Sequence, residues 1–469
     1  MLAIKLSLIG WNQAEYTDGI IQLNLWQSQV VFFPPGYSAL VWLVERVFDD
    51  ALMAGRLVSI LASVLAIPLL YRLALSVTQN VPAALWAAGF FALSPIYSRW
   101  SLRVMTDSLF CTLFIAAAWL FWRAWRDPQK SIWPIVLMAG LASLVRYQGF
   151  YFAALSIWLL WLRRSGGLSF SIRSISGWLL ASLPWLTLAG WVAMRGFGHH
   201  EQFMERGSYG FWTTLLLYYN MFETYLLYWP WAITHGLFAV GCLGLYWMSQ
   251  REGLRAFVIF LAVTSVVFLT VQSAFLSFQY RYLLPLVPLW CVAAGYGWTV
   301  WQEHLSSTWR PVLGGLLLAN LIIMSSAVIT LQRGAFGDIA SSAHYFSEVW
   351  QSARLYSNEA YRENVYAPKA EFWSGRPVEY YYPNHPEFGV GDIVLLHNSY
   401  GDLEDMVESL RERFELRVLG EWRAKAIPLL PDIMVFPNQV GLTSNPPAMA
   451  FRFTRQSYMT IALRAEKAK

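Results

Sequence analysis

Residues 1–332 alternate long apolar runs with short polar turns. Most runs are about 18 to 25 residues long, the length at which a helix crosses the hydrocarbon of a bilayer. Arg, Lys or Trp flank the runs, as is typical at membrane interfaces. They lack two-residue alternation, so the pattern predicts membrane-spanning helices rather than a barrel. The predicted spans are residues 54–77, 83–96, 107–125, 132–145, 150–162, 175–194, 224–248, 255–275, 282–301 and 312–331.

Two stretches near the start are shorter. Residues 1–10 are apolar but cannot cross a bilayer alone, so we interpret them as the end of a first helix that is cut short. Residues 36–48 predict an amphipathic helix along the interface. The spans at 132–145 and 150–162 are short too, and we expect them to pack inside a bundle or line a cavity.

From residue 333 onward the composition is that of a soluble domain. The pattern predicts a helix at 348–357, strands at 364–366 and 392–397, a helix at 403–414 and strands at 414–421 and 451–463, with a frayed end at 465–469. The predicted fold class is an all-α polytopic membrane bundle of about 10–11 helices followed by a small α/β domain. The predicted domains are residues 1–332, a transmembrane catalytic domain, and residues 333–469.

Composition supports a membrane protein. The chain of 469 residues is 57% hydrophobic and only 13% charged, whereas soluble domains contain about 25% charged residues. A net charge of +5 fits an excess of cytoplasmic Lys and Arg, so we expect no nucleic-acid partner. Cys111, Cys242 and Cys291 lie far apart in apolar runs and fit neither metal spacing nor a disulfide framework.

The polar turns predict an orientation. If the basic turns share one side, that side is cytoplasmic. These turns contain Arg72, Arg123, Arg126, Lys130, Arg163, Arg164, Arg173, Arg251, Arg255 and Arg310. Alternation of the spans then places Asp18, the turn at 99–107, Arg146, Arg281 and the C-terminal domain on the extracytoplasmic face. We expect the chemistry on that face.

Asp18 is the first candidate for that chemistry. It lies in a polar and aromatic loop, Glu15-Tyr16-Thr17-Asp18-Gly19, beside the membrane. A carboxylate partly removed from water has a raised pKa and is suited to accept a proton. The alternative is a Thr-Asp-Gly turn or a helix cap.

Asp107 is the second candidate. It stands where an outer turn becomes the next span, and Thr106 or Asp107 could simply cap that helix. Several other charged residues are predicted on the same face, and this favours a functional role for Asp107. Ionisable groups at membrane depth usually face a cavity or a partner. The arginines on the same face are Arg99, Arg103, Arg146 and Arg281, and Arg56 lies early in its own span.

These arginines have two interpretations. Each arginine could extend its side chain to the membrane interface. Alternatively, the arginines together could bind a lipid-linked phosphate, because one guanidinium group can form two parallel hydrogen bonds to phosphate oxygens. His199 and His200 are adjacent and do not predict a metal site. No Gly-rich phosphate loop, nucleophile elbow or zinc spacing is present in the sequence, which argues against a soluble nucleotide-sugar site.

Several motifs together resemble one family. They are Tyr16-Thr17-Asp18-Gly19, Phe33-Pro34-Pro35-Gly36-Tyr37, Ala54-Gly55-Arg56-Leu57, Ser94-Pro95, Thr106-Asp107, Arg146-Tyr147-Gln148-Gly149 and Arg281-Tyr282-Leu283-Leu284-Pro285. Their order resembles the GT-C glycosyltransferase superfamily, in particular the bacterial branch related to protein O-mannosyltransferases and aminoarabinose transferases. The resemblance covers residues 10–300.

The resemblance implies an integral-membrane transferase that uses a polyprenyl-phosphate-linked sugar and inverts the anomeric centre. Asp18 and Asp107 match the two acidic positions and would be catalytic. Arg56, Arg103, Arg146 and Arg281 would bind the donor phosphate. The substrate loop would contain Glu15, Tyr16, Pro34, Pro35 and Tyr37. No metal ligand is assigned, and no cofactor is expected, although a divalent cation is left open because some relatives use one.

The expected partners are membrane lipid, the lipid-linked donor and an acceptor hydroxyl or amine on an unknown glycan, lipid or protein. The expected location is the cell membrane, inner or plasma, with a multi-pass topology. One departure stands out, since Phe32-Phe33 occupy the place before Pro-Pro where the family often has a basic residue. The alternative function is a lipid-linked-sugar flippase or small-molecule transporter, although transporters usually show paired repeats with broken helices.

Overall fold

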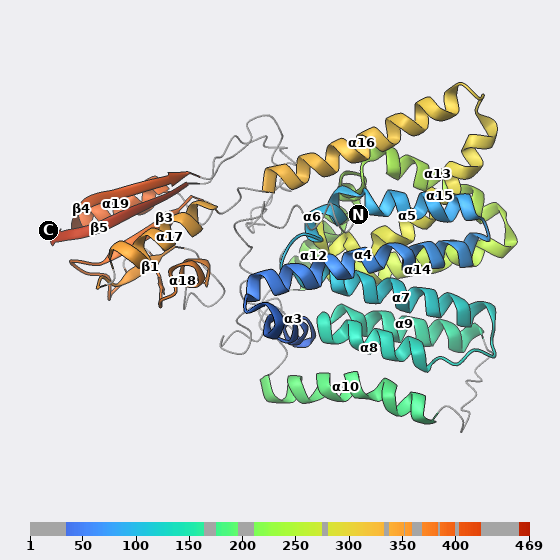
Figure 1. Ribbon diagram of the computed structural model, residues 1–469, viewed down its shortest axis with the longest axis horizontal. Coiled ribbons are helices and arrows are strands. Elements are labelled where there is room, and N and C mark those ends of the chain that lie inside the picture. Colours follow the sequence, from blue (N-terminus) through green and yellow to red (C-terminus); the bar gives the residue numbers. More distant parts are fainter. Residues whose placement is uncertain are drawn as a thin grey trace. The chain divides into compact units, whose positions relative to one another are not determined.

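The computed structural model describes residues 34–163, 175–195, 211–273, 280–332, 337–350, 352–358, 368–382, 385–398, 403–423 and 459–469. They form two compact units, and the chain passes from the first to the second after Val328. The first unit is helical (Figure 1). Its helices are α3 (Gly36–Phe48), α4 (Ala51–Thr78), α5 (Val81–Ala92), α6 (Pro95–Trp100), α7 (Thr106–Arg126), α8 (Trp133–Val145), α9 (Gln148–Arg163), α10 (Ile175–Arg195), α12 (Phe211–Ile233), α13 (His235–Gln250), α14 (Glu252–Ser273), the 3₁₀ helix η3 (Tyr280–Leu286), α15 (Val287–His304) and α16 (Trp309–Gln332).

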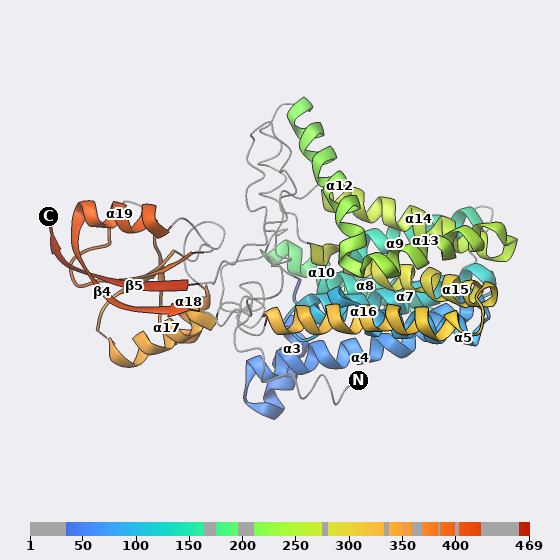
Figure 2. The same ribbon diagram turned by 90° about the horizontal axis from the view of Figure 1, so that it is seen from above.

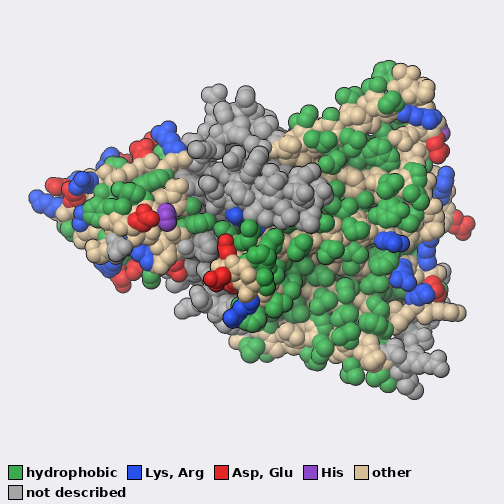
Figure 3. Space-filling view, viewed as in Figure 1, with side chains coloured by type: hydrophobic (Ala, Val, Ile, Leu, Met, Phe, Trp, Pro, Cys, Tyr) green, Lys and Arg blue, Asp and Glu red, His purple; other side chains and the backbone are tan. Residues whose placement is uncertain are grey.

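The helical unit has helices with the length and composition of membrane spans. Among the described residues, six helices are long and apolar enough to span a bilayer, and α5, α8 and α9 are shorter apolar helices. Hydrophobic side chains cover much of the face of this unit that Figure 3 shows. Leu179, Leu186 and Ile323 are among those more than 60% exposed, a pattern that fits contact with lipid. The chain is an integral membrane protein, and the predicted all-α bundle with a small C-terminal α/β region is confirmed.

Two predicted spans differ from the structure. The span predicted at 224–248 is divided between α12 and α13, which meet at Thr234, and α12 begins already at Phe211, before the predicted start of the span. Pro230 lacks the N–H that a continuous helix requires, and Thr234 has a positive φ of 77°. The span predicted at 83–96 is likewise interrupted, because α6 restarts the helix at Pro95, a residue favoured in the first helical turn.

Helix α15 occupies the centre of the bundle. Within residues 281–304, 89% of the 18-residue apolar stretch is buried. A Cβ on Gly295 would lie 2.4 Å from the carbonyl oxygen of Ala83 in α5, and one on Gly244 of α13 would lie 1.9 Å from that of Ala293. Small residues therefore let these three backbones approach closely, as is common between membrane helices.

The two ends of the bundle differ in charge and contents. At one end, Lys and Arg side chains gather (right in Figure 3). The turns there lie after α4, α7, α13 and α15 (Figure 1). At the opposite end α4, α7, α9 and α15 begin, and α8 and α14 end. The functional candidates lie at this second end.

The second unit contains a five-stranded sheet in the order β2-β1-β3-β5-β4. The strands are β1 (Leu355–Ser357), β2 (Glu379–Tyr380), β3 (Ile393–His397), β4 (Phe414–Arg423) and β5 (Met459–Ala468), and the helices are α17 (Gly337–Val349), α18 (Pro368–Ser374) and α19 (Leu403–Arg413). β1 pairs in parallel with β2 and β3, whereas β5 is antiparallel to β3 and β4. Figure 2 shows α17 and α19 on opposite faces of the sheet, and each face has its own apolar core.

The predictions for this unit were correct in part. The strand at 392–397, the helix at 403–414 and the strand at 414–421 are confirmed. The helix predicted at 348–357 is wrong, because α17 ends at Val349 and β1 follows. The predicted frayed end is wrong as well, since β5 pairs with β4 up to Ala468. The strand predicted at 364–366 lies outside the described residues.

Candidate active site

Asp107 lies in the first turn of α7, and its side chain is 2% exposed. The helix has no side-chain cap, because the residue that precedes it is Met105. The capping role considered for Thr106 or Asp107 is therefore not what holds this carboxylate. Its two oxygens instead face two arginines, Arg146 and Arg281.

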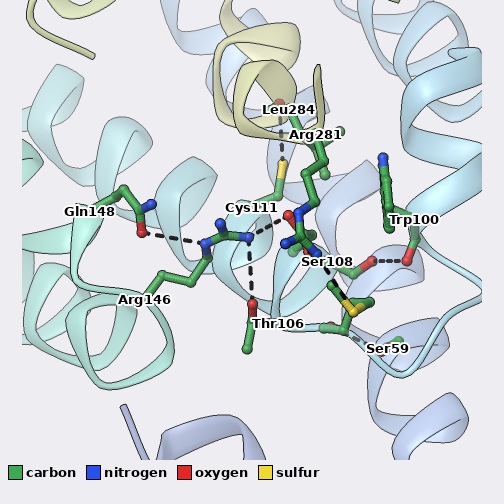
Figure 4. Close-up of polar contacts among 11 residues, drawn as sticks. Ser59, Trp100, Thr106, Ser108, Cys111, Arg146, Gln148, Arg281 and Leu284 are labelled. Atoms are coloured by element: carbon green, nitrogen blue, oxygen red, sulfur yellow. Dashed lines mark hydrogen bonds and ion pairs between the residues drawn. The ribbon is translucent and has the colours of Figure 1, made fainter. Parts of the chain in front are cut away.

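Arg146 comes from the turn between α8 and α9. Its Nη1 donates a hydrogen bond to Oδ1 of Asp107 and lies 3.5 Å from Oγ1 of Thr106. Its Nε donates to Oε1 of Gln148 at 3.3 Å, which fixes the plane of the guanidinium group (Figure 4). The turn is tight, because a Cβ on Gly149 would lie 2.4 Å from the backbone nitrogen of Ser143. Glycine is thus what allows α9 to begin against the end of α8.

Arg281 reaches the same carboxylate from the short helix η3. Its Nη1 lies 3.9 Å from Oδ2 of Asp107 and 3.8 Å from Sδ of Met105. The thiol of Cys111 in α7 donates to the carbonyl oxygen of Leu284 at 3.9 Å. Arg281 and Leu284 approach the start of α7 from the same element (Figure 4).

Aromatic rings surround the two guanidinium groups. The guanidinium carbon of Arg146 lies 5.2 Å from the ring centroid of Tyr282, and that of Arg281 lies 5.4 Å from the ring of Trp100. Ring faces attract cations. They also keep water from the groups they cover, which strengthens electrostatic interactions at the site.

A pocket opens beside this ion cluster. It contains about 200 Å³ of empty space, including space continuous with solvent. Its lining residues are Asp107, Phe110, Arg146, Gln148, Phe268, Gln272, Arg281, Tyr282, Leu284 and Pro285. Three of the predicted site residues thus meet in one cavity, although the chain brings them from α7, the α8–α9 turn and η3.

The other predicted residues have different places. Arg56 in α4 and Arg103 before α7 are buried but do not line the pocket. Pro34 and Pro35 are buried and precede α3. A Cβ on Gly36 would lie 2.7 Å from the carbonyl oxygen of Leu144, so this motif packs against the end of α8.

Tyr37 is fully buried and connects α3 to the start of α7. Its hydroxyl donates to the carbonyl oxygen of Gly55 and is 2.9 Å from Oγ of Ser59. Ser59 in turn donates to the carbonyl oxygen of Met105 at 3.3 Å. Tyr37 thus helps to position the backbone that precedes Asp107. Glu15, Tyr16 and Asp18 lie outside the described residues.

Metal binding was left open by the sequence. In the part of the chain that the structure describes, no group of three His, Cys, Asp or Glu side chains could hold a metal ion. The described site consists of one carboxylate, two guanidinium groups and amides, a set suited to an anion rather than a cation.

Sequence reasoning missed two polar pocket residues, Gln148 and Gln272. Gln272 lies near the end of the apolar helix α14. A polar side chain within a membrane span is a functional signal, and this signal could have identified it.

Two of three comparisons with known proteins found a similarity. A family model described as dolichyl-phosphate-mannose-protein mannosyltransferase matches residues 33–191. No curated protein sequence matches the chain. The fold is similar to the crystal structure of ArnT from Cupriavidus metallidurans in the apo state, with a TM-score of 0.54, 12% identity and coverage of 89% of this chain and 95% of that one.

Two further structures are similar. ArnT from the same organism bound to undecaprenyl phosphate gives a TM-score of 0.55, with the same identity and coverage. The apo oligosaccharyltransferase of Archaeoglobus fulgidus gives 0.52 at 12% identity and covers 79% of this chain and 60% of that one. The resemblance to the GT-C superfamily that the motifs indicated is confirmed at the level of the fold.

Proposed function

We propose that this chain, whose fold is that of the GT-C glycosyltransferases, transfers a sugar from a polyprenyl-phosphate donor to a hydroxyl or amine of an acceptor. The observation that carries the proposal is the buried cluster of Asp107, Arg146 and Arg281 at the pocket. One carboxylate between two guanidinium groups leaves a net charge of +1. Such a cluster suits a phosphate that becomes more negative as it leaves.

The reaction needs two kinds of group. The acceptor oxygen or nitrogen attacks the anomeric carbon, the bond from that carbon to the phosphate oxygen breaks, and the phosphate departs with the bonding electrons. Attack from the face opposite the phosphate inverts the anomeric centre. A base must take the acceptor proton, and we assign this role to Asp18, which lies outside the described residues.

Arg146 and Arg281 would neutralise the departing phosphate, with support from Arg56 and Arg103. Asp107 touches both pocket arginines and would hold them in place before the donor binds. Such advance positioning matters, because a charge that is already oriented costs no rearrangement during the reaction. The acceptor would be a glycan, lipid or protein group.

The position of the site predicts the side of the membrane. The basic turns lie at the opposite end of the bundle, and basic turns favour the cytoplasm. The site would then face the extracytoplasmic side of the cell membrane, together with the C-terminal domain. Proteolysis of sealed vesicles tests this orientation, since a C-terminal domain protected in right-side-out vesicles contradicts it.

The function itself is tested with purified protein in detergent or liposomes. Polyprenyl-phosphate sugars are supplied one at a time with a panel of acceptors, and free polyprenyl phosphate is measured. We expect release with at least one donor and an acceptor that gains the sugar. Movement of intact donor across liposomes without any release would instead support the flippase alternative.

A further inference from the structure

Gln272 stands out among the buried polar side chains of the helical unit. It is 1% exposed and lines the pocket beside Asp107, Arg146 and Arg281. Within the described part of the protein, neither its Oε1 nor its Nε2 has a hydrogen-bond partner. Buried amides are nearly always hydrogen-bonded. We therefore expect a ligand bound in the pocket to form hydrogen bonds with both Oε1 and Nε2 of Gln272.

The other pocket amide shows the contrast. Oε1 of Gln148 accepts a hydrogen bond from Arg146 at 3.3 Å, so Gln148 serves the guanidinium group. The amide of Gln272 forms no hydrogen bond with any described residue, although it lines the same cavity. Its place near the end of α14, one turn after Phe268, puts it on a helix different from those that supply the charged residues.

The chemistry of an amide indicates which part of a donor it would meet. Phosphate oxygens only accept hydrogen bonds, so a phosphate would satisfy Nε2 and leave Oε1 unpaired. A hydroxyl group both donates and accepts, and the hydroxyls of a sugar ring can satisfy both atoms of one amide. The pocket also has two arginines that suit the phosphate better, because charge-assisted hydrogen bonds are the stronger ones.

We propose that Gln272 binds a hydroxyl group of the sugar carried by the donor and so helps to determine which sugar is transferred. The proposal rests on the proposed function, because it assumes a phosphate-linked sugar in this pocket. It assigns the phosphate to the arginines and the sugar to the amide. A residue that hydrogen-bonds a substrate hydroxyl discriminates strongly against analogues that lack it.

The test uses Gln272→Met, which preserves the length of the side chain and removes both polar atoms. The full-length protein is assayed for kcat/KM with its preferred donor and for binding of two ligands, the polyprenyl-phosphate sugar and polyprenyl phosphate without sugar. We expect kcat/KM to fall about 10-fold to 100-fold, the loss that follows when one substrate hydrogen bond is removed. Affinity for polyprenyl phosphate alone should stay within about twofold, because the arginines are intact.

Thr264→Val is the matched control. Thr264 lies on the same helix, is 2% exposed, and its Oγ1 also lacks a hydrogen-bond partner among the described residues, but it does not line the pocket. It should leave both measurements unchanged. A deoxy-sugar donor adds a second check, since wild type should lose activity with it whereas Gln272→Met should not lose more.

Two outcomes overturn the proposal. If Gln272→Met weakens binding of bare polyprenyl phosphate as much as binding of the lipid-linked sugar, Gln272 acts on the phosphate or on the fold. If the variant matches wild type in every measurement, the amide has no role. Failure of the proposed function is recognised separately, because wild type would then release no lipid phosphate. The affinities for the lipid-linked sugar and for polyprenyl phosphate alone, compared between wild type and Gln272→Met, would still decide for or against Gln272.

Discussion

Asp107 and Arg146 form a buried ion pair that joins the start of α7 to the turn between α8 and α9, 39 positions away. The side chains are 2% and 8% exposed. Ion pairs at this depth are costly to desolvate and are weak evidence for stability alone. The pair is better explained by the pocket that it lines, where it holds a charged group in a fixed position.

We expect Asp107→Asn to destabilise the protein. The substitution leaves Arg146 and Arg281 buried beside a neutral amide, and breaking one partner of a buried pair costs about 3 to 5 kcal/mol. Thermal unfolding in detergent measures the effect. The control is Asp127→Asn, which alters an exposed pair with Lys130 and should change stability by less than about 1 kcal/mol. Equal shifts in the two variants would contradict the prediction.

The double variant Asp107→Leu with Arg146→Met separates folding from function. Replacing both members of a buried pair by apolar residues is often neutral or stabilising. We therefore expect the double variant to be more stable than Asp107→Asn, because Arg146 is no longer a buried charge that has lost its carboxylate, but less stable than wild type, because Arg281 still loses its carboxylate neighbour. Transfer is abolished, because the pocket has lost a guanidinium group and its positioning carboxylate. A double variant that transfers sugar normally would show that the pair is structural.

The sequence predicted the bundle because span length is a local property. The runs that became α4, α7, α10, α14 and α16 were identified from hydropathy alone. The break at Thr234 was missed, since the run continues to be apolar through Pro230 and only the backbone reveals the change. The three-residue strand β1 was missed for a related reason, because three residues are too few to show a two-residue alternation.

The site was predicted in part. Alternation of the spans correctly brought Asp107, Arg146 and Arg281 to one end of the bundle, but it could not predict that the two arginines would meet the same carboxylate. That meeting depends on how η3 and the α8–α9 turn pack around α7. Gln272 was overlooked because one polar residue barely alters the hydropathy of a run of 22 residues.

Gly149→Ala should lower transfer, because it displaces the turn that carries Arg146. The added Cβ would lie 2.4 Å from the backbone nitrogen of Ser143, so the turn that carries Arg146 must shift. Because a displacement of about 1 Å at a catalytic group can cost about 100-fold in rate, we expect kcat to fall at least tenfold. Gly190→Ala in α10 is the matched control, since a Cβ there meets nothing within 4 Å. Comparable losses in both variants would refute a positional effect.

Arg281→Ala should weaken binding of the donor more than binding of the acceptor. A lost charge-assisted hydrogen bond is worth about 1.5 to 3 kcal/mol, so the donor KM should rise about tenfold or more while the acceptor KM stays within about twofold. Arg255→Ala is the control, because Arg255 is exposed and bonds the carbonyl oxygen of Ser249 at the opposite end of the bundle. Equal changes in both KM values would indicate a structural role for Arg281.

Asp18→Asn should abolish transfer while the protein folds and binds the donor normally. The amide has the shape of the carboxylate but cannot accept the acceptor proton at neutral pH, and loss of a general base typically costs about 100-fold to 10,000-fold in rate. Donor affinity should remain, because the arginines that bind the phosphate are unchanged.

The control is Asp49→Asn, which replaces an exposed acid in the left-handed conformation after α3, a conformation that asparagine tolerates. Release of lipid phosphate is measured for both variants at saturating donor and acceptor. Normal turnover by Asp18→Asn would remove Asp18 from the reaction and leave Asp107 as the candidate base. In that case Asp107 would have to release one arginine to accept the proton.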